Sequence, residues 1–102
     1  MTGFITIAGA DELEAGEMRA FDVRGVKIAV ANVSGAFHAF DDTCTHAGCS
    51  LAGGDLEETT VICACHGSEF DVRSGEVLRG PAREPVATYE TRVEDGRLEI
   101  ED

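Results

Sequence analysis

Short runs of alternating hydrophobic and polar residues recur along the chain about every 8–12 residues, a spacing typical of a small all-β domain. The runs cover residues 4–7, 18–24, 26–33, 36–40, 59–63, 69–72, 87–93 and 97–100. Turn residues separate several of them, as at Ser34-Gly35, Ser74-Gly75 and Glu94-Asp95-Gly96. Residues 11–17 offer one helical turn, which Gly16 cuts short. The pattern predicts a small antiparallel β-sandwich or barrel.

Size and charge narrow the choice of partners. The chain has 102 residues, enough for one small core, and we expect a single domain with a loop-rich insert over residues 41–68. Eight basic and twenty acidic residues give a net charge of −12. This charge argues against nucleic acid and anionic membranes, favours basic protein partners, and keeps a small carrier soluble and monomeric. The first residues carry no signal-peptide pattern, so we expect a cytoplasmic protein.

Four cysteines in a reducing compartment suggest metal ligands or redox groups before a disulfide framework. Two clusters combine Cys with His: Cys44-x-His46 and Cys63-x-x-His66. Zinc also accepts two Cys and two His, but a zinc finger takes its Cys pair and its His pair from separate elements, whereas each cluster here supplies one of each. A plant-type all-Cys iron–sulfur site needs a C-x₂-C pair that this sequence lacks.

With these motifs the chain resembles the Rieske iron–sulfur proteins, and its cluster loops resemble those of the cytochrome bc-type subgroup. The resemblance implies the Rieske fold and a [2Fe–2S] cluster. Cys44 and Cys63 would hold one iron, and His46 and His66 the other. Two ferric ions, two sulfides and two thiolates sum formally to zero charge, so this centre takes up an electron more easily than an all-thiolate one. Its potential would lie roughly between −150 and +300 mV, against about −400 mV for plant-type centres.

The same resemblance assigns roles to residues around the motifs. It implies a disulfide between Cys49 and Cys65; the alternative is that both are small buried hydrophobic side chains. Ser68 matches a position that donates a hydrogen bond to a cluster sulfur. Phe70 matches a second such position, usually Tyr, and has no donor, so we expect a lower potential than in fully bonded members. Gly80 and Pro81 open a loop, residues 80–85, that would cover the cluster.

We therefore expect one Rieske domain over residues 1–102, with a cluster-binding subdomain at about 41–72. In the family the two His ligands lie at the tip of the domain, so His46 and His66 would mark the electron exit. No basic residue occurs between positions 27 and 73. Asp41 and Asp42 would belong to an acidic collar that steers a basic docking face toward the His ligands.

The sequence shows no nucleophile–base pair and no phosphate-binding loop, so we expect an electron carrier and not an enzyme. By resemblance it is the ferredoxin component of a multicomponent oxygenase. It would carry single electrons from a flavin-dependent NAD(P)H reductase to a terminal aromatic-ring-hydroxylating oxygenase. The alternative is a small Rieske subunit of a cytosolic reductase, such as an assimilatory nitrite reductase.

Overall fold

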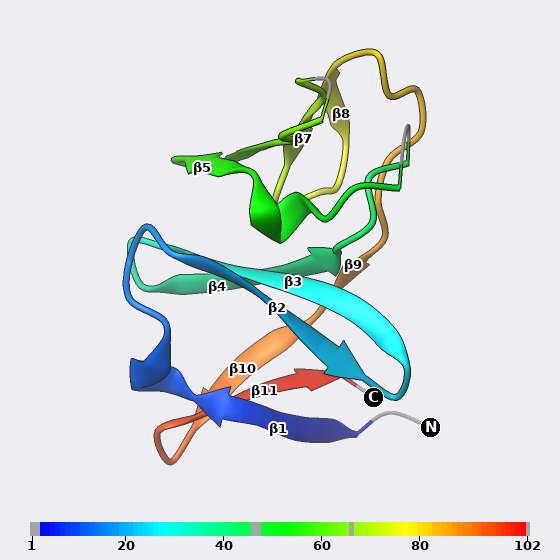
Figure 1. Cartoon of the computed structure of the whole chain (residues 1–102). Helices are drawn as coiled ribbons and strands as arrows, with labels where there is room; N and C mark the ends of the chain where they lie inside the picture. The colour runs from blue at the N-terminus through cyan, green and yellow to red at the C-terminus, as the bar shows by residue number, and fades with distance from the viewer. Residues whose placement is uncertain (1–2, 46–47, 66, 102) are drawn as a thin grey trace.

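A computed structural model describes residues 3–45, 48–65 and 67–101. These residues are organised almost entirely as short strands (Figure 1). The strands are β1 (Phe4–Gly9), β2 (Met18–Val23), β3 (Val26–Val33), β4 (Ala36–Asp41), β5 (Asp55–Glu57), β6 (Thr60–Ile62), β7 (Glu69–Asp71), β8 (Val77–Arg79), β9 (Thr88–Tyr89), β10 (Thr91–Glu94) and β11 (Arg97–Glu101). Two 3-10 turns, η1 (Ala10–Glu12) and η2 (Leu51–Gly53), are the helical segments of the described ranges.

The strands form three antiparallel sheets stacked along the molecule (Figure 1). A terminal sheet has the order β1-β11-β10, and a middle sheet the order β2-β3-β4-β9. The third sheet, β5-β6-β7-β8, is a meander that lies over the other face of the middle sheet, at the top of Figure 1. This arrangement confirms the predicted all-β fold.

The middle sheet is buried on both faces, which explains the long hydrophobic run in β3. Alternate side chains of β3 enter two different cores because strand side chains alternate between faces. Toward the terminal sheet the core contains Leu13, Val23, Ile28, Val30, Ala39, Leu98 and Ile100. Toward the third sheet it contains Ala29, Ala31, Phe40, Cys44, Leu51, Val61, Cys63, Phe70, Val72, Ala82 and Val86. The second core therefore reaches directly into both cysteine motifs.

Most predicted strands are present, with β3 at its predicted bounds. Two strands were not predicted: β5, with the sequence Asp-Leu-Glu, and β8, which follows the turn at Ser74-Gly75. The run over 87–93 divides into β9 and β10. Since β8 belongs to the third sheet, that sheet extends to Arg79, beyond residue 72. None of the helical segments in the described part of the chain is long and apolar enough to cross a membrane.

Candidate metal centre

The first cysteine loop, residues 44–49, follows β4 and turns back on itself. The Cys44 N–H donates to the Cys49 carbonyl at 2.8 Å, and the Gly48 N–H donates to the Cys44 carbonyl at 2.9 Å. Both hydrogen bonds involve the backbone of Cys44. They therefore fix the direction in which the Cys44 side chain leaves the loop. That side chain is 2% exposed.

The second cysteine loop, residues 63–68, repeats this frame. The Cys63 N–H donates to the Ser68 carbonyl at 2.8 Å, and the Gly67 N–H donates to the Cys63 carbonyl at 3.0 Å. Cys63 is also 2% exposed. Two loops from different parts of the chain thus present one buried thiol each, in equivalent backbone settings.

A glycine occupies the fourth position after the first cysteine in both loops. Gly48 has φ of +74° and Gly67 has φ of +78°, in the left-handed region that favours glycine. In the sequence, each glycine stands four residues after the first cysteine of its loop, Cys44 or Cys63. This shared spacing indicates that the two loops have the same backbone conformation.

A disulfide between Cys49 and Cys65 joins the two loops, with a Cα–Cα separation of 6.5 Å. The bond implied by the resemblance is thus present in the structure, and Cys44 and Cys63 keep free thiols. The two cysteines that belong to the Cys/His motifs are therefore the two that stay available as ligands. His46 and His66 lie outside the described residues.

The covering loop, residues 80–85, is hydrogen-bonded to both cysteine loops. The Thr45 hydroxyl donates to the Glu84 carbonyl at 2.7 Å, and the Ala82 N–H donates to the Ser68 hydroxyl oxygen at 3.0 Å. Sequence reasoning did not assign a role to Thr45 or Ala82, since both contacts join segments far apart in the chain and no local pattern marks them.

Ser68 and Phe70 are both fully buried and belong to the second loop and the strand that follows it. Phe70 pairs with Val61 across β7 and β6 and contributes to the core beneath the cysteine loops. The surroundings of the Phe70 side chain are apolar, which suits a side chain that has no hydrogen-bond donor.

The acidic residues near the centre are engaged within the fold. Asp42 is 5% exposed, and its carboxylate accepts a hydrogen bond from the Ala52 N–H at 2.8 Å. Asp42 was predicted to belong to an acidic collar, but it is too buried to present its charge at the surface, and its carboxylate binds a partly buried backbone amide of η2. Asp41 accepts a short hydrogen bond from the Tyr89 hydroxyl, which also holds it in the fold.

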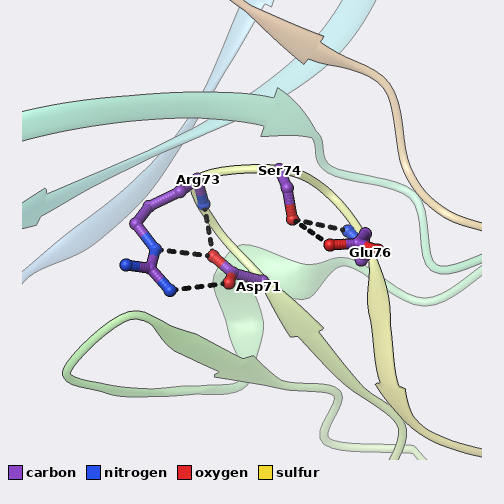
Figure 2. Close-up of polar contacts among 4 residues, drawn as sticks. All are labelled: Asp71, Arg73, Ser74 and Glu76. Atoms are coloured by element: carbon purple, nitrogen blue, oxygen red, sulfur yellow. Dashed lines mark hydrogen bonds and ion pairs between the residues drawn. The ribbon is translucent and has the colours of Figure 1, made fainter.

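The turn between β7 and β8 is stabilised by two local polar pairs (Figure 2). Arg73 folds back onto Asp71 and donates two side-chain hydrogen bonds, at 3.1 and 2.9 Å. These bonds lower the pKa of the Asp71 carboxyl. Ser74 and Glu76 form the second pair, with the Ser74 hydroxyl 3.3 Å from the carboxylate. Asp71 is thus neutralised locally and contributes little field to a docking surface.

The third histidine, His38, lies on β4, apart from both cysteine loops. Partial burial lowers its pKa, and the nearby Arg73 guanidinium lowers it further. The fold therefore favours the neutral form of this partly buried imidazole.

This donor set suits an iron–sulfur centre. Two buried thiols emerge from matched loops, a disulfide fixes the loops to each other, and a third loop is bonded to both. Soft thiolate ligands in an apolar setting are what such clusters use. The fold and the pair of buried thiols fit the class of iron–sulfur electron carriers.

Comparison with known families identifies the class more closely. The Rieske [2Fe–2S] domain family matches residues 3–90. The chain therefore belongs to the Rieske family, whose cofactor is a [2Fe–2S] cluster, as the resemblance implied.

Several of the similar proteins are ferredoxins of oxygenase systems. The ferredoxin component of biphenyl 2,3-dioxygenase from Rhodococcus jostii (strain RHA1) is 39% identical over 88 residues, which cover 86% of this chain and 82% of the relative. The solved ferredoxin of carbazole 1,9a-dioxygenase from Nocardioides aromaticivorans IC177 has a TM-score of 0.92 at 28% identity, covering 95% of each chain. A chain in the complex of reduced oxygenase and oxidized ferredoxin in carbazole 1,9a-dioxygenase has a TM-score of 0.91 at 30% identity, covering 95% of this chain and 91% of that one.

Proposed function

We propose that this protein is the ferredoxin component of a multicomponent aromatic-ring-hydroxylating oxygenase. The observation that carries the proposal is the likeness to the ferredoxin component of biphenyl 2,3-dioxygenase, which covers 86% of this chain and 82% of the relative. A Rieske [2Fe–2S] domain over residues 3–90 suits a carrier that passes one electron at a time.

In this proposal Cys44 and Cys63 bind one iron of the cluster, and His46 and His66 bind the other. The equivalent backbone frames and the burial of the two free thiols support the Cys assignment. The His assignment rests on the sequence motifs alone. Neutral imidazole can bind iron through one nitrogen and leave the other at the surface. Electrons would then enter and leave through the imidazoles.

The cluster-binding part of the single domain comprises the third sheet, the two cysteine loops and the covering loop that starts at Gly80-Pro81. The partners are proteins: a flavin-dependent reductase that takes electrons from NAD(P)H, and a terminal oxygenase that receives them. Because NAD(P)H is supplied in the cytoplasm, we place the protein there, as a monomer that meets each partner transiently.

The test is to replace the native ferredoxin in a reconstituted biphenyl 2,3-dioxygenase reaction. Purified holoprotein is added to the reductase and oxygenase components with NADH and biphenyl, and product is followed together with NADH consumption. We expect turnover that depends on the holoprotein and is absent with the apoprotein. A holoprotein that the reductase does not reduce and that does not reduce the oxygenase would contradict the proposal.

A further inference from the structure

Three sulfur atoms lie together beside the proposed metal centre. The sulfurs of Cys49, Cys63 and Cys65 are all within 4.8 Å of one another. Two of them form the disulfide, and the third belongs to the free thiol of Cys63. The other free thiol, that of Cys44, is not in this group, as far as the described residues show.

We propose that, whenever Cys63 is not bound to iron, its thiolate exchanges with the Cys49–Cys65 disulfide. Thiol–disulfide exchange needs a thiolate that reaches a disulfide sulfur and attacks it along the line of the S–S bond. The Cys63 sulfur lies within 4.8 Å of both disulfide sulfurs, so Cys63 can supply the attacking thiolate without an external thiol. The exchange is a rearrangement of existing bonds, so it needs neither an oxidant nor a reductant.

The exposure of the two disulfide sulfurs selects one product. Attack at the Cys49 sulfur forms a Cys49–Cys63 bond, breaks the Cys49–Cys65 bond, and releases Cys65 as a thiolate that takes up a proton. Cys65 is exposed, whereas Cys49 is only partly exposed. Water therefore stabilises a thiolate leaving at Cys65 better than one leaving at Cys49. The expected product is a Cys49–Cys63 disulfide with Cys65 free.

The product keeps the two loops joined but loses one of the thiols needed for iron. This consequence rests on the proposed function, in which Cys63 is a cluster ligand; the exchange itself does not. A cluster bound to Cys63 would prevent the attack, because the iron-bound sulfur is no longer a free thiolate. The apoprotein would then lose its ability to take up a cluster over time, unless an added thiol restores the original pairing.

Cys44 provides a matched control within the chain. Cys44 and Cys63 are both free, both 2% exposed, and both held by the same backbone frame. Among the described residues, Cys63 is the free cysteine whose sulfur lies within 4.8 Å of both disulfide sulfurs. If proximity controls the exchange, Cys63 takes part and Cys44 does not. If general unfolding of the apoprotein controls it, both take part.

The experiment is a disulfide map of the full-length apoprotein. Apoprotein prepared by anaerobic chelation is held at constant neutral pH without reductant, and samples are quenched with acid and N-ethylmaleimide. Trypsin cannot separate the cysteines, because there is no Lys or Arg between Lys27 and Arg73. A protease that cleaves after acidic residues can cut at Asp55, Glu57 and Glu58, between the two loops. Fragmentation of the linked peptides then distinguishes the two cysteines within each loop.

We expect the maleimide label to move from Cys63 to Cys65 with time, while Cys44 stays labelled. The Cys44→Ser variant should behave in the same way, and the Cys63→Ser variant should keep only the Cys49–Cys65 bond. Holoprotein held in parallel should also keep that bond. An unchanged Cys49–Cys65 pairing in the wild-type apoprotein, or equal participation of Cys44, would overturn the proposal.

Cluster reconstitution on the same samples separates this proposal from the ligand assignment. We expect the capacity for iron and sulfide to fall as the Cys49–Cys63 product accumulates, and to return after treatment with a thiol reductant. If the new disulfide forms but reconstitution is unaffected, the exchange is correct and the assignment of Cys63 as a ligand is wrong.

Discussion

The Ala82 N–H donates a hydrogen bond to the Ser68 hydroxyl oxygen at 3.0 Å, and both residues are buried. The bond occupies an acceptor position of the hydroxyl and leaves its proton available. Among residues 3–45, 48–65 and 67–101, no group accepts that proton. Ser68 is therefore able to connect the covering loop to the second cysteine loop and to donate toward a cluster sulfur in the same conformation.

Replacing Ser68 by Ala should lower both the reduction potential and the stability. Losing a donor to sulfur removes an interaction that strengthens on reduction, and the expected decrease is on the order of 50–100 mV, if the bond gains about 1–2 kcal/mol on reduction. The Ala82 N–H would lose its buried partner, which costs about 1–3 kcal/mol of unfolding free energy. Voltammetry and chemical denaturation measure the two effects.

The Ser68→Thr variant is the control, since it keeps the hydroxyl. It should retain most of the potential even if the added methyl group lowers stability. A potential that is unchanged in Ser68→Ala would contradict the role of this hydroxyl at the cluster.

Replacing Phe70 by Tyr should raise the reduction potential. Phe70 is fully buried and lies two residues beyond Ser68, so an added hydroxyl needs a partner inside the protein. In this account the partner is a sulfur of the centre, and the bond would favour the reduced, more negative form. Protein film voltammetry measures the shift.

Phe40 offers a matched control, because it is equally buried in the same core but lies on β4. The Phe40→Tyr variant should lose about 1–3 kcal/mol of stability, as expected for an unpaired buried hydroxyl, without a rise in potential. If Phe70→Tyr behaves like Phe40→Tyr, position 70 does not face the cluster.

The sequence predicted those strands in which burial produces a clear pattern of hydrophobic and polar residues. β3 was located at its bounds because its hydrophobic run ends in turn residues on both sides. β5 was not, since its sequence Asp-Leu-Glu has two charged residues of low β propensity, and its pairing with β6 at a sheet edge provides the structure instead. Local patterns do not encode such tertiary pairing.

The same distinction applies to the site. The Cys/His motifs are local, and they can be recognised directly in the sequence. The contact of Ser68 with Ala82 spans separate loops and became visible only in the fold. From the sequence alone, Asp42 is expected to be a charged surface residue. In the fold its carboxylate accepts a hydrogen bond from the Ala52 amide instead.

The single tyrosine, Tyr89, should lose its phenol proton at a higher pH than a free tyrosine does. Burial, followed by the hydrogen bond to Asp41 and the charge of Asp41, raises the pKa of Tyr89 from 10.0 to about 12. A raised pKa means that the fold favours the neutral phenol. Its contribution to stability is thus fully present below pH 10 and is lost as the pH rises toward about 12.

This titration can be followed by tyrosinate absorbance, because the chain has one Tyr and no Trp. Subtracting the Tyr89→Phe variant removes any contribution from the cluster. The Asp41→Asn variant should lower the pKa of Tyr89, since it removes the carboxylate charge. A pKa of Tyr89 that does not respond to Asp41→Asn would contradict the observed contact.

Electron transfer to the oxygenase should slow as salt rises from about 10 to about 500 mM, because the Debye length falls from about 30 Å to a few ångströms and screens the net charge of −12. The structure distinguishes acidic residues that are exposed, such as Glu58, from those that are buried and hydrogen-bonded within the fold, such as Asp42. Glu58→Gln, at an exposed site, should lower the rate at low salt. Asp42→Asn should instead lower stability and leave the salt dependence unchanged. Stopped-flow kinetics measure the rates, and a rate independent of salt would contradict charge steering.

The central claim is that two Cys and two His hold a [2Fe–2S] cluster in this chain. The most direct measurement is pulsed EPR on the dithionite-reduced holoprotein, with iron and sulfide counted on the same sample. We predict about two irons per chain and hyperfine couplings from two imidazole nitrogens. A spectrum without nitrogen coupling would require all-thiolate ligation. An EPR-silent protein that contains zinc would contradict the account of an electron carrier altogether.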